Sequence, residues 1–105
     1  MITILLLLAL HAPKATAMTL FKAHYIAVEG TDPEYGQGAI ERNEMRHHPL
    51  PQLRWLILTD EPTTAPELQA RLNAAVDPKN GSFVIDAPSA DEEEQVRSGK
   101  IEFQR

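Results

Sequence analysis

Short apolar runs bounded by turn residues mark three strands along the chain. Residues 19–29 are rich in β-branched and aromatic side chains and end at Gly30. Residues 53–59, Leu-Arg-Trp-Leu-Ile-Leu-Thr, are nearly all apolar, and residues 82–86 follow an Asn-Gly turn signal. Strands that are apolar on both faces are typical of the interior of a sheet. The pattern therefore places residues 53–59, and the second half of residues 19–29, at the centre of a sheet.

The clearest helix follows Thr64. Thr64 and Glu67 have the spacing of a capping box, in which each side chain accepts a hydrogen bond from the backbone N–H of the other residue. Apolar residues then recur at helical spacing up to Asp77 and Pro78, where the pattern ends. Residues 65–76 are therefore predicted to form an amphipathic helix.

Two weaker helix signals flank this one. Residues 39–45 are predicted as a helix that begins near Gly38, because Gly36 and Gly38 would cost about 1 kcal/mol each inside a helix. Ser89 and Glu92 repeat the capping-box spacing, but few apolar residues follow them. They predict a short helix that is exposed on most of its surface.

The order of these elements predicts a single α+β domain over residues 18–105. If residues 46–50 form a strand that pairs with residues 53–59, the order is βαββαβ, the ferredoxin-like plan. The two amphipathic helices then cover one face of a mixed or antiparallel sheet. Residues 101–103 alternate apolar, polar and apolar, so we expect an edge strand there.

The first seventeen residues allow three interpretations. Residues 4–10 are apolar and Ala-Thr-Ala follows, which is the outline of a cleaved secretory signal, although no Lys or Arg precedes the run. Alternatively, Met18 is the true start of the protein. In the third interpretation residues 2–10 add a strand to the sheet, whose apolar edge would need a partner. The first interpretation implies a periplasmic protein, whereas the others suit the cytoplasm.

Composition narrows the chemistry. The chain has no cysteine, which excludes disulfides, thiolate metal sites and cysteine nucleophiles. Its 15 Asp and Glu against 10 Lys and Arg give a net charge of −5, which repels phosphate backbones. We therefore do not expect nucleic-acid binding. A membrane span is not expected either, because crossing a bilayer takes about 20 apolar residues and the apolar run at residues 4–10 is far shorter.

Three segments resemble the ferredoxin-like family that includes the Cas-two CRISPR adaptation subunit, VapD-type toxins and small SinR-like proteins. They are Tyr-Ile-Ala-Val-Glu at residues 25–29, the hairpin at residues 47–58, and the helix, turn and strand at residues 64–86. The resemblance implies a homodimer that forms through the sheet, with a C-terminal strand completing the partner's edge. It also implies a divalent metal at the end of the first strand, where Glu29 stands in place of the family's usual aspartate. Glutamate is a suitable ligand for Mg²⁺.

Three histidines are candidate metal ligands. His24 on the first strand and the pair His47-His48 would form a site with Glu29 or Asp60. Adjacent residues on a strand point to opposite faces, however, so both rings of the pair do not reach one ion. We expect surface or turn histidines instead.

A second acidic cluster surrounds Gly30. Glu29, Asp32 and Glu34 lie at a strand end, where carboxylates serve acid–base or Mg²⁺ chemistry in many sheets. Asp32 also suits a helix cap. We favour a solvated turn with a capping aspartate.

Candidate partner-binding residues come from two segments. Arg54 and Trp55 are of the types enriched in interface hot spots, although a tryptophan in a central strand is more often a core residue. The acidic run before Gln95 suits a basic protein surface, or simply a solvated helix face. Its members are Asp91, Glu92, Glu93 and Glu94.

These observations favour a small acidic interaction or regulatory protein, of the kind that bacteria or phages encode, which acts as a homodimer through protein contacts. No residue is assigned a catalytic role and no cofactor is expected. One alternative is a metal-dependent nuclease of the Cas-two or VapD type, with Glu29 holding Mg²⁺. The other is an exported periplasmic protein.

Overall fold

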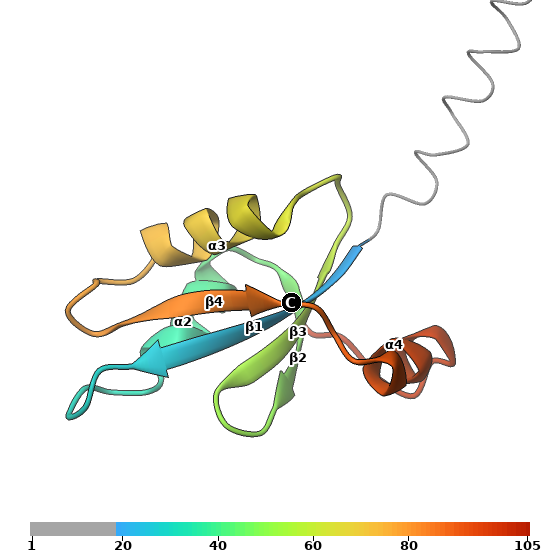
Figure 1. The fold of residues 1–105 in the computed structure, drawn as a ribbon, viewed down its shortest axis with the longest axis horizontal. Coiled ribbons are helices and arrows are strands. Elements are labelled where there is room, and N and C mark those ends of the chain that lie inside the picture. Colours follow the sequence, from blue (N-terminus) through green and yellow to red (C-terminus); the bar gives the residue numbers. More distant parts are fainter. Residues whose placement is uncertain (1–18) are drawn as a thin grey trace, which may run out of the picture.

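The computed structural model describes residues 19–105, so the three interpretations of residues 1–17 lie outside the described residues. The described chain forms strands and helices in the order β1-α2-β2-β3-α3-β4-α4 (Figure 1). Its strands are β1 (Thr19–Ala27), β2 (Arg46–Leu50), β3 (Arg54–Thr59) and β4 (Gly81–Asp86). Its helices are α2 (Tyr35–Arg42), α3 (Ala65–Ala74) and α4 (Ala90–Arg97).

The strands form one open sheet in the order β2-β3-β1-β4, and all neighbouring pairs are antiparallel. β1 and β3 are interior strands, as the continuous apolar runs predicted. The α+β class is therefore confirmed. So are the helix that follows Thr64 and the strand at Arg46–Leu50, which pairs with β3.

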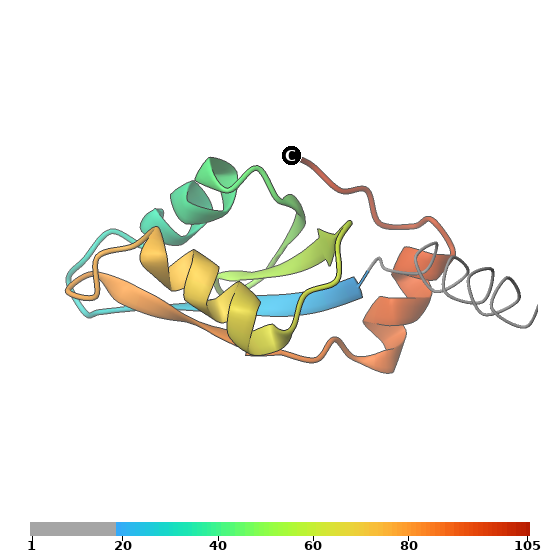
Figure 2. The ribbon, with the colours of Figure 1, turned by 90° about the horizontal axis from the view of Figure 1, so that it is seen from above.

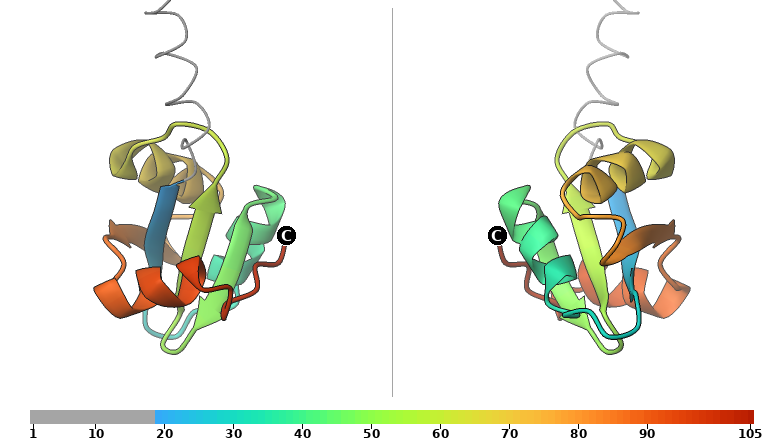
Figure 3. Two further views of the ribbon diagram at one scale, coloured as in Figure 1. Left: turned by 90° about the vertical axis from the view of Figure 1, so that its right-hand side faces the viewer. Right: turned by 90° about the vertical axis from the view of Figure 1, so that its left-hand side faces the viewer.

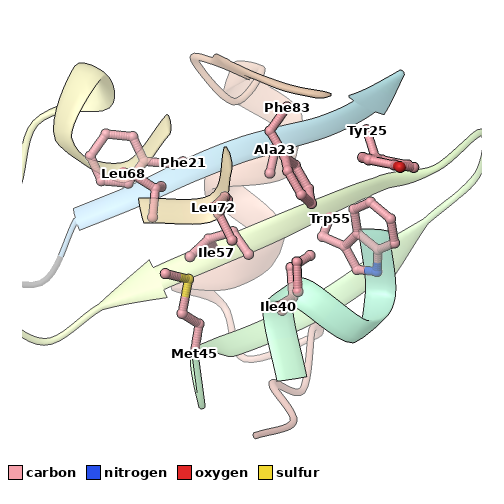
Figure 4. Close-up of a cluster of buried hydrophobic side chains, with 11 residues drawn as sticks. Phe21, Ala23, Tyr25, Ile40, Met45, Trp55, Ile57, Leu68, Leu72 and Phe83 are labelled. Atoms are coloured by element: carbon pink, nitrogen blue, oxygen red, sulfur yellow. The ribbon is translucent and has the colours of Figure 1, made fainter. Parts of the chain in front are cut away.

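The core lies between one face of the sheet and the helices α2 and α3 (Figure 2 and Figure 4). On this face Tyr25 pairs across the strands with Phe83, and their ring centroids are 5.1 Å apart. Both predicted amphipathic helices therefore cover the same face. The buried cluster comprises Phe21, Ala23, Tyr25, Ala39, Ile40, Met45, Trp55, Ile57, Leu68, Leu72 and Phe83.

The start of α2 was predicted wrongly. The helix begins at Tyr35 and includes both glycines, whereas helix propensity placed its start near Gly38. A Cβ atom at Gly36 would lie 2.7 Å from Cγ of Tyr25. Gly36 therefore lets the helix approach β1 closely, and this packing outweighs the propensity cost.

The C-terminal edge strand was also predicted wrongly. Residues 101–103 form no strand, because the backbone of the segment after α4 pairs with the backbone of β2 at a single position. There Gln104 exchanges two backbone hydrogen bonds with His47, with N···O distances of 2.8 and 2.7 Å. This bridge occupies part of the outer edge of β2.

The outer edge of β4 is covered by side chains of α3. The backbone N–H of Phe83 donates to Oδ1 of Asn73 at 2.7 Å, and Nδ2 of Asn73 lies 3.4 Å from the carbonyl oxygen of Phe83. The N–H of Ile85 donates to Oε1 of Gln69 at 3.2 Å. Unpaired edge groups are a template for pairing with another chain. The side-chain amides of α3 remove much of that template.

Candidate protein interaction surface

The second face of the sheet is covered only at the end where β1 begins. At the other end, strand pairing aligns a row of side chains across all four strands, and Ile26 and Ser82 form the next row. Successive side chains on a strand alternate between faces, so these residues point away from the core. We call them the open face: Leu50, Arg54, His24, Val84, Ile26 and Ser82.

Two large apolar side chains of the open face are in contact with solvent. Ile26 is 49% exposed and Val84 is 38% exposed. They are diagonal neighbours across the β1–β4 pairing, since Ile26 lies opposite Ser82, and diagonal neighbours on one face are close enough to act together. Val28, just past the end of β1, is also exposed. Clustered exposed apolar side chains are typical of interaction sites.

The covered end of the second face carries α4 (Figure 3). Nζ of Lys22 lies 3.0 Å from Oε1 of Glu92, and Val96 shares a cavity of about 410 Å³ with Leu20 and Leu58. Leu56, which points to this face, is fully buried. No residue of α4 is fully buried, so the helix is held to the sheet by its ion pair and by the partly buried side chains of Gln95 and Val96.

Electrostatics distinguish α4 from the open face. Burial opposes ionisation of Glu92, but hydrogen bonds from the backbone of Ser89 and from Lys22 outweigh it and hold the pKa of Glu92 below its usual range. On the open face, Arg54 donates only to the carbonyl of Pro51 and the side chain of Gln52. Among the described residues, no carboxylate pairs with Arg54. The acidic helix and the cationic open face thus lie on one side of the sheet.

The predicted partner-binding residues lie in three different places in the structure. Arg54 lies on the open face, but Trp55 points into the core, is 4% exposed, and donates its indole N–H to Oε1 of Gln37 at 2.7 Å. The assignment of Trp55 to partner binding is therefore corrected, because adjacent strand residues face opposite sides. The acidic run lies on α4, where Glu92 is engaged and the other members are exposed: Asp91, Glu93 and Glu94.

The three candidate histidines, all within the described residues, are separated in space. His47 is buried, with Nδ1 lying 2.8 Å from the carbonyl oxygen of Met45, and His48 lies on the opposite face with Nδ1 3.0 Å from the carbonyl oxygen of Glu102. Since a carbonyl only accepts, His47 donates from Nδ1. His24 belongs to the open face. Residues 19–105 contain no group of three or more His, Asp or Glu side chains placed to hold a metal ion.

Glu29 lies in the exposed turn after β1. In the same turn Oδ1 of Asp32 accepts a hydrogen bond from the backbone N–H of Glu34 at 2.9 Å. Asp32 was expected to cap the helix, but the residue before α2 is Glu34, and its side chain makes no cap bond. The nuclease alternative stays a prediction. Cleavage of RNA or DNA with Mg²⁺ that is lost on Glu29→Gln would support it.

A separate polar cavity of about 520 Å³ lies beside the end of β3. Asp60 at its rim pairs with Arg46 at 2.9 Å and with Arg105 at 3.2 Å. Both carboxylate oxygens are thus engaged by guanidinium groups of the same chain. Asp60 is therefore compensated within the chain, and the other carboxylates that line the cavity are those of Glu44, Glu61 and Glu67.

Sequence reasoning missed the exposed residues of the open face. The apolar pattern in the second half of residues 19–29 predicted a central position in the sheet, which β1 has, yet Ile26 is exposed and no described element covers it. The sequence signal available was the absence of a third strongly amphipathic helix, since Ser89 and Glu92 begin a helix with little apolar surface. Between Thr19 and Arg105, no helix has the length and apolar content needed to cross a membrane.

In comparisons with known proteins, the chain matches no protein-family model, no curated protein and no solved structure. The resemblance to the Cas-two and VapD-type proteins therefore stays a prediction.

Proposed function

We propose that this chain is a small acidic interaction protein without enzymatic activity, which forms a homodimer through its open face. The observation that carries the proposal is the pair of exposed apolar side chains, Ile26 and Val84, on a sheet face that the chain's own helices leave uncovered. Burial of apolar surface is the main source of favourable free energy in most protein associations.

The edges of the sheet are less available for contact with a second copy than the open face is. Gln104 bonds the backbone of β2, and side chains of α3 bond the backbone of β4. Pairing of edges between two copies would have to displace these bonds. A contact through the open face leaves all of them in place, which is why we prefer it to the strand exchange that the family resemblance implies.

We also propose that the sheet follows the ferredoxin-like plan, as the order of elements predicted. Two connections support this. In each of β1-α2-β2 and β3-α3-β4, the helical crossover joins strands that are separated by one antiparallel strand. This split βαβ arrangement, used twice, is the feature by which the plan is recognised.

Sedimentation equilibrium over a wide concentration range tests the homodimer. We expect the full chain to dimerise, and the double variant Ile26→Asp with Val84→Asp to remain monomeric, because it places two carboxylates in the contact. Tyr35→Asp is the matched control, since Tyr35 is an exposed large residue on α2, on the other side of the sheet. A full chain that stays monomeric at every concentration would overturn the proposal.

A further inference from the structure

We infer that the segment docking on the open face is α4 of a second copy, so that two chains cover each other's open faces reciprocally. This inference rests on the homodimer proposed above and names the contact that forms it. It is carried by the shape and the charge of the second sheet face.

The second face consists of a ridge and a recess placed end to end along the strands. The ridge is α4, which lies over Lys22 and Leu20, near the start of β1. The recess is the open face, near the end of β1, and Figure 1 places α4 at the opposite end of the domain from the loop that follows β1. One surface therefore carries both halves of a possible contact.

The dimensions of the recess suit one helix. From His24 to Ala27 the uncovered part of β1 has four residues, which at a rise of about 3.3 Å per residue span about 13 Å. An α-helix with its side chains is about 10–12 Å wide. A two-fold rotation that brings the second faces of two chains together sets each ridge in the other chain's recess, and such a self-complementary contact closes a dimer.

The charges of the two halves are opposite. Glu92 faces its own sheet, and the helical turn of about 100° per residue places Glu94 on the far side of α4 and Asp91 on its flank. Glu94 also bonds Arg97 of its own helix. In the recess, Arg54 and His24 are cross-strand neighbours, and no carboxylate of the described chain pairs with either. Complementary potentials of this kind set partner choice and orientation.

The apolar residues complete the match. Ile26 and Val84 flank His24 on the open face, so a helix seated there also removes their side chains from water. An acidic helix of a different protein would have the same complementary charge to the open face. The second copy is preferred because every copy presents such a helix beside such a recess.

The test is a charge exchange between two variants. In Arg54→Glu, the altered residue meets Asp91 and Glu94 of its partner, and in Asp91→Lys with Glu94→Lys the new lysines meet Arg54. Each variant alone is therefore expected to dimerise roughly tenfold or more weakly than the unchanged chain, as measured by sedimentation equilibrium. In a mixture of the two, both contacts pair opposite charges again. Native mass spectrometry should then show the heterodimer with an affinity restored to within a fewfold of the unchanged protein.

The outcomes separate the inference from the proposal on which it rests. Restoration on mixing supports the inference and excludes misfolding of either variant. Suppose that the unchanged chain dimerises, that Ile26→Asp with Val84→Asp abolishes the dimer, and that neither charge variant weakens it. This result overturns the inference, whereas the homodimer proposal remains supported. Weakening without restoration overturns it as well. A monomeric full chain overturns both. Glu61→Lys, an exposed charge reversal in the loop after β3, is the matched control and should leave the dimer unchanged.

Discussion

Nζ of Lys22 on β1 lies 3.0 Å from Oε1 of Glu92 in the first turn of α4, a contact that spans 70 residues of sequence. The two side chains are 17% and 20% exposed, so the pair is partly shielded from water. Glu92 is at the same time the capping-box partner of Ser89. One carboxylate therefore both begins the helix and fastens it to the sheet.

Replacing Glu92 by Gln should loosen α4. Glutamine still accepts the hydrogen bond of a capping box, so the change removes mainly the charge that pairs with Lys22. A partly buried ion pair of this kind contributes about 1 kcal/mol, so amide hydrogen exchange in α4 should become roughly fivefold faster. Hydrogen exchange read by mass spectrometry measures this.

Glu67→Gln provides the control for that variant. Thr64 and Glu67 make the same capping box at the start of α3, and no lysine pairs with Glu67 in the described structure. Exchange in α3 should change little. Equal acceleration in the two helices would mean that the cap, rather than Lys22, accounts for the effect.

The same ion pair should make the stability of α4 depend on pH. The pKa of Glu92 is lowered in the folded protein, so its contribution is fully present above the carboxyl pKa of the unfolded chain, about 4.3. That contribution is lost as the pH falls through the lower folded pKa. The difference in unfolding free energy between the unchanged chain and Glu92→Gln, followed by urea titration at several pH values, should shrink in acid. A difference that grows in acid would contradict this assignment.

Tyr25→Phe should stabilise the protein. The hydroxyl of Tyr25 is buried and has no hydrogen-bond partner among the described residues, and its burial, followed by the nearby Tyr35 and Asp32, raises the pKa of Tyr25. A buried polar group without a partner costs about 1–3 kcal/mol, so phenylalanine should raise the unfolding free energy by about 1 kcal/mol. Urea unfolding followed by tryptophan fluorescence measures the change, with Tyr35→Phe as the exposed control. A loss of stability in Tyr25→Phe would show that the hydroxyl is satisfied.

Two glycines of α2 should respond in opposite directions to alanine. Gly36→Ala places a Cβ atom 2.7 Å from Cγ of buried Tyr25 and should destabilise the protein by about 1–3 kcal/mol. Gly38→Ala meets only the end of the flexible Arg42 side chain, at 3.2 Å, and should stabilise the helix by up to about 1 kcal/mol. Thermal unfolding of both variants gives the comparison. Destabilisation by both changes to the same extent would argue against the close approach of α2 to β1.

The sequence by itself determined the local elements. The capping boxes at Thr64 and Ser89, and the apolar run of β3, each involve residues within a few positions of one another, and each prediction is confirmed. Hydrogen bonds and periodicity on that scale are properties of the segment alone, so a single chain displays them without any knowledge of its neighbours.

Only the tertiary structure decided what lies against what. The position of α2 depends on Tyr25 beside Gly36, and the backbone of the C-terminal segment pairs with β2 at Gln104 alone. Ile26 remains exposed because α4 is fastened over Lys22 instead. Each of these outcomes depends on contacts between segments far apart in the chain. Such contacts leave no periodic signal in the sequence. For that reason the exposure of the open face could not be predicted, although each of its residues can be read from the sequence.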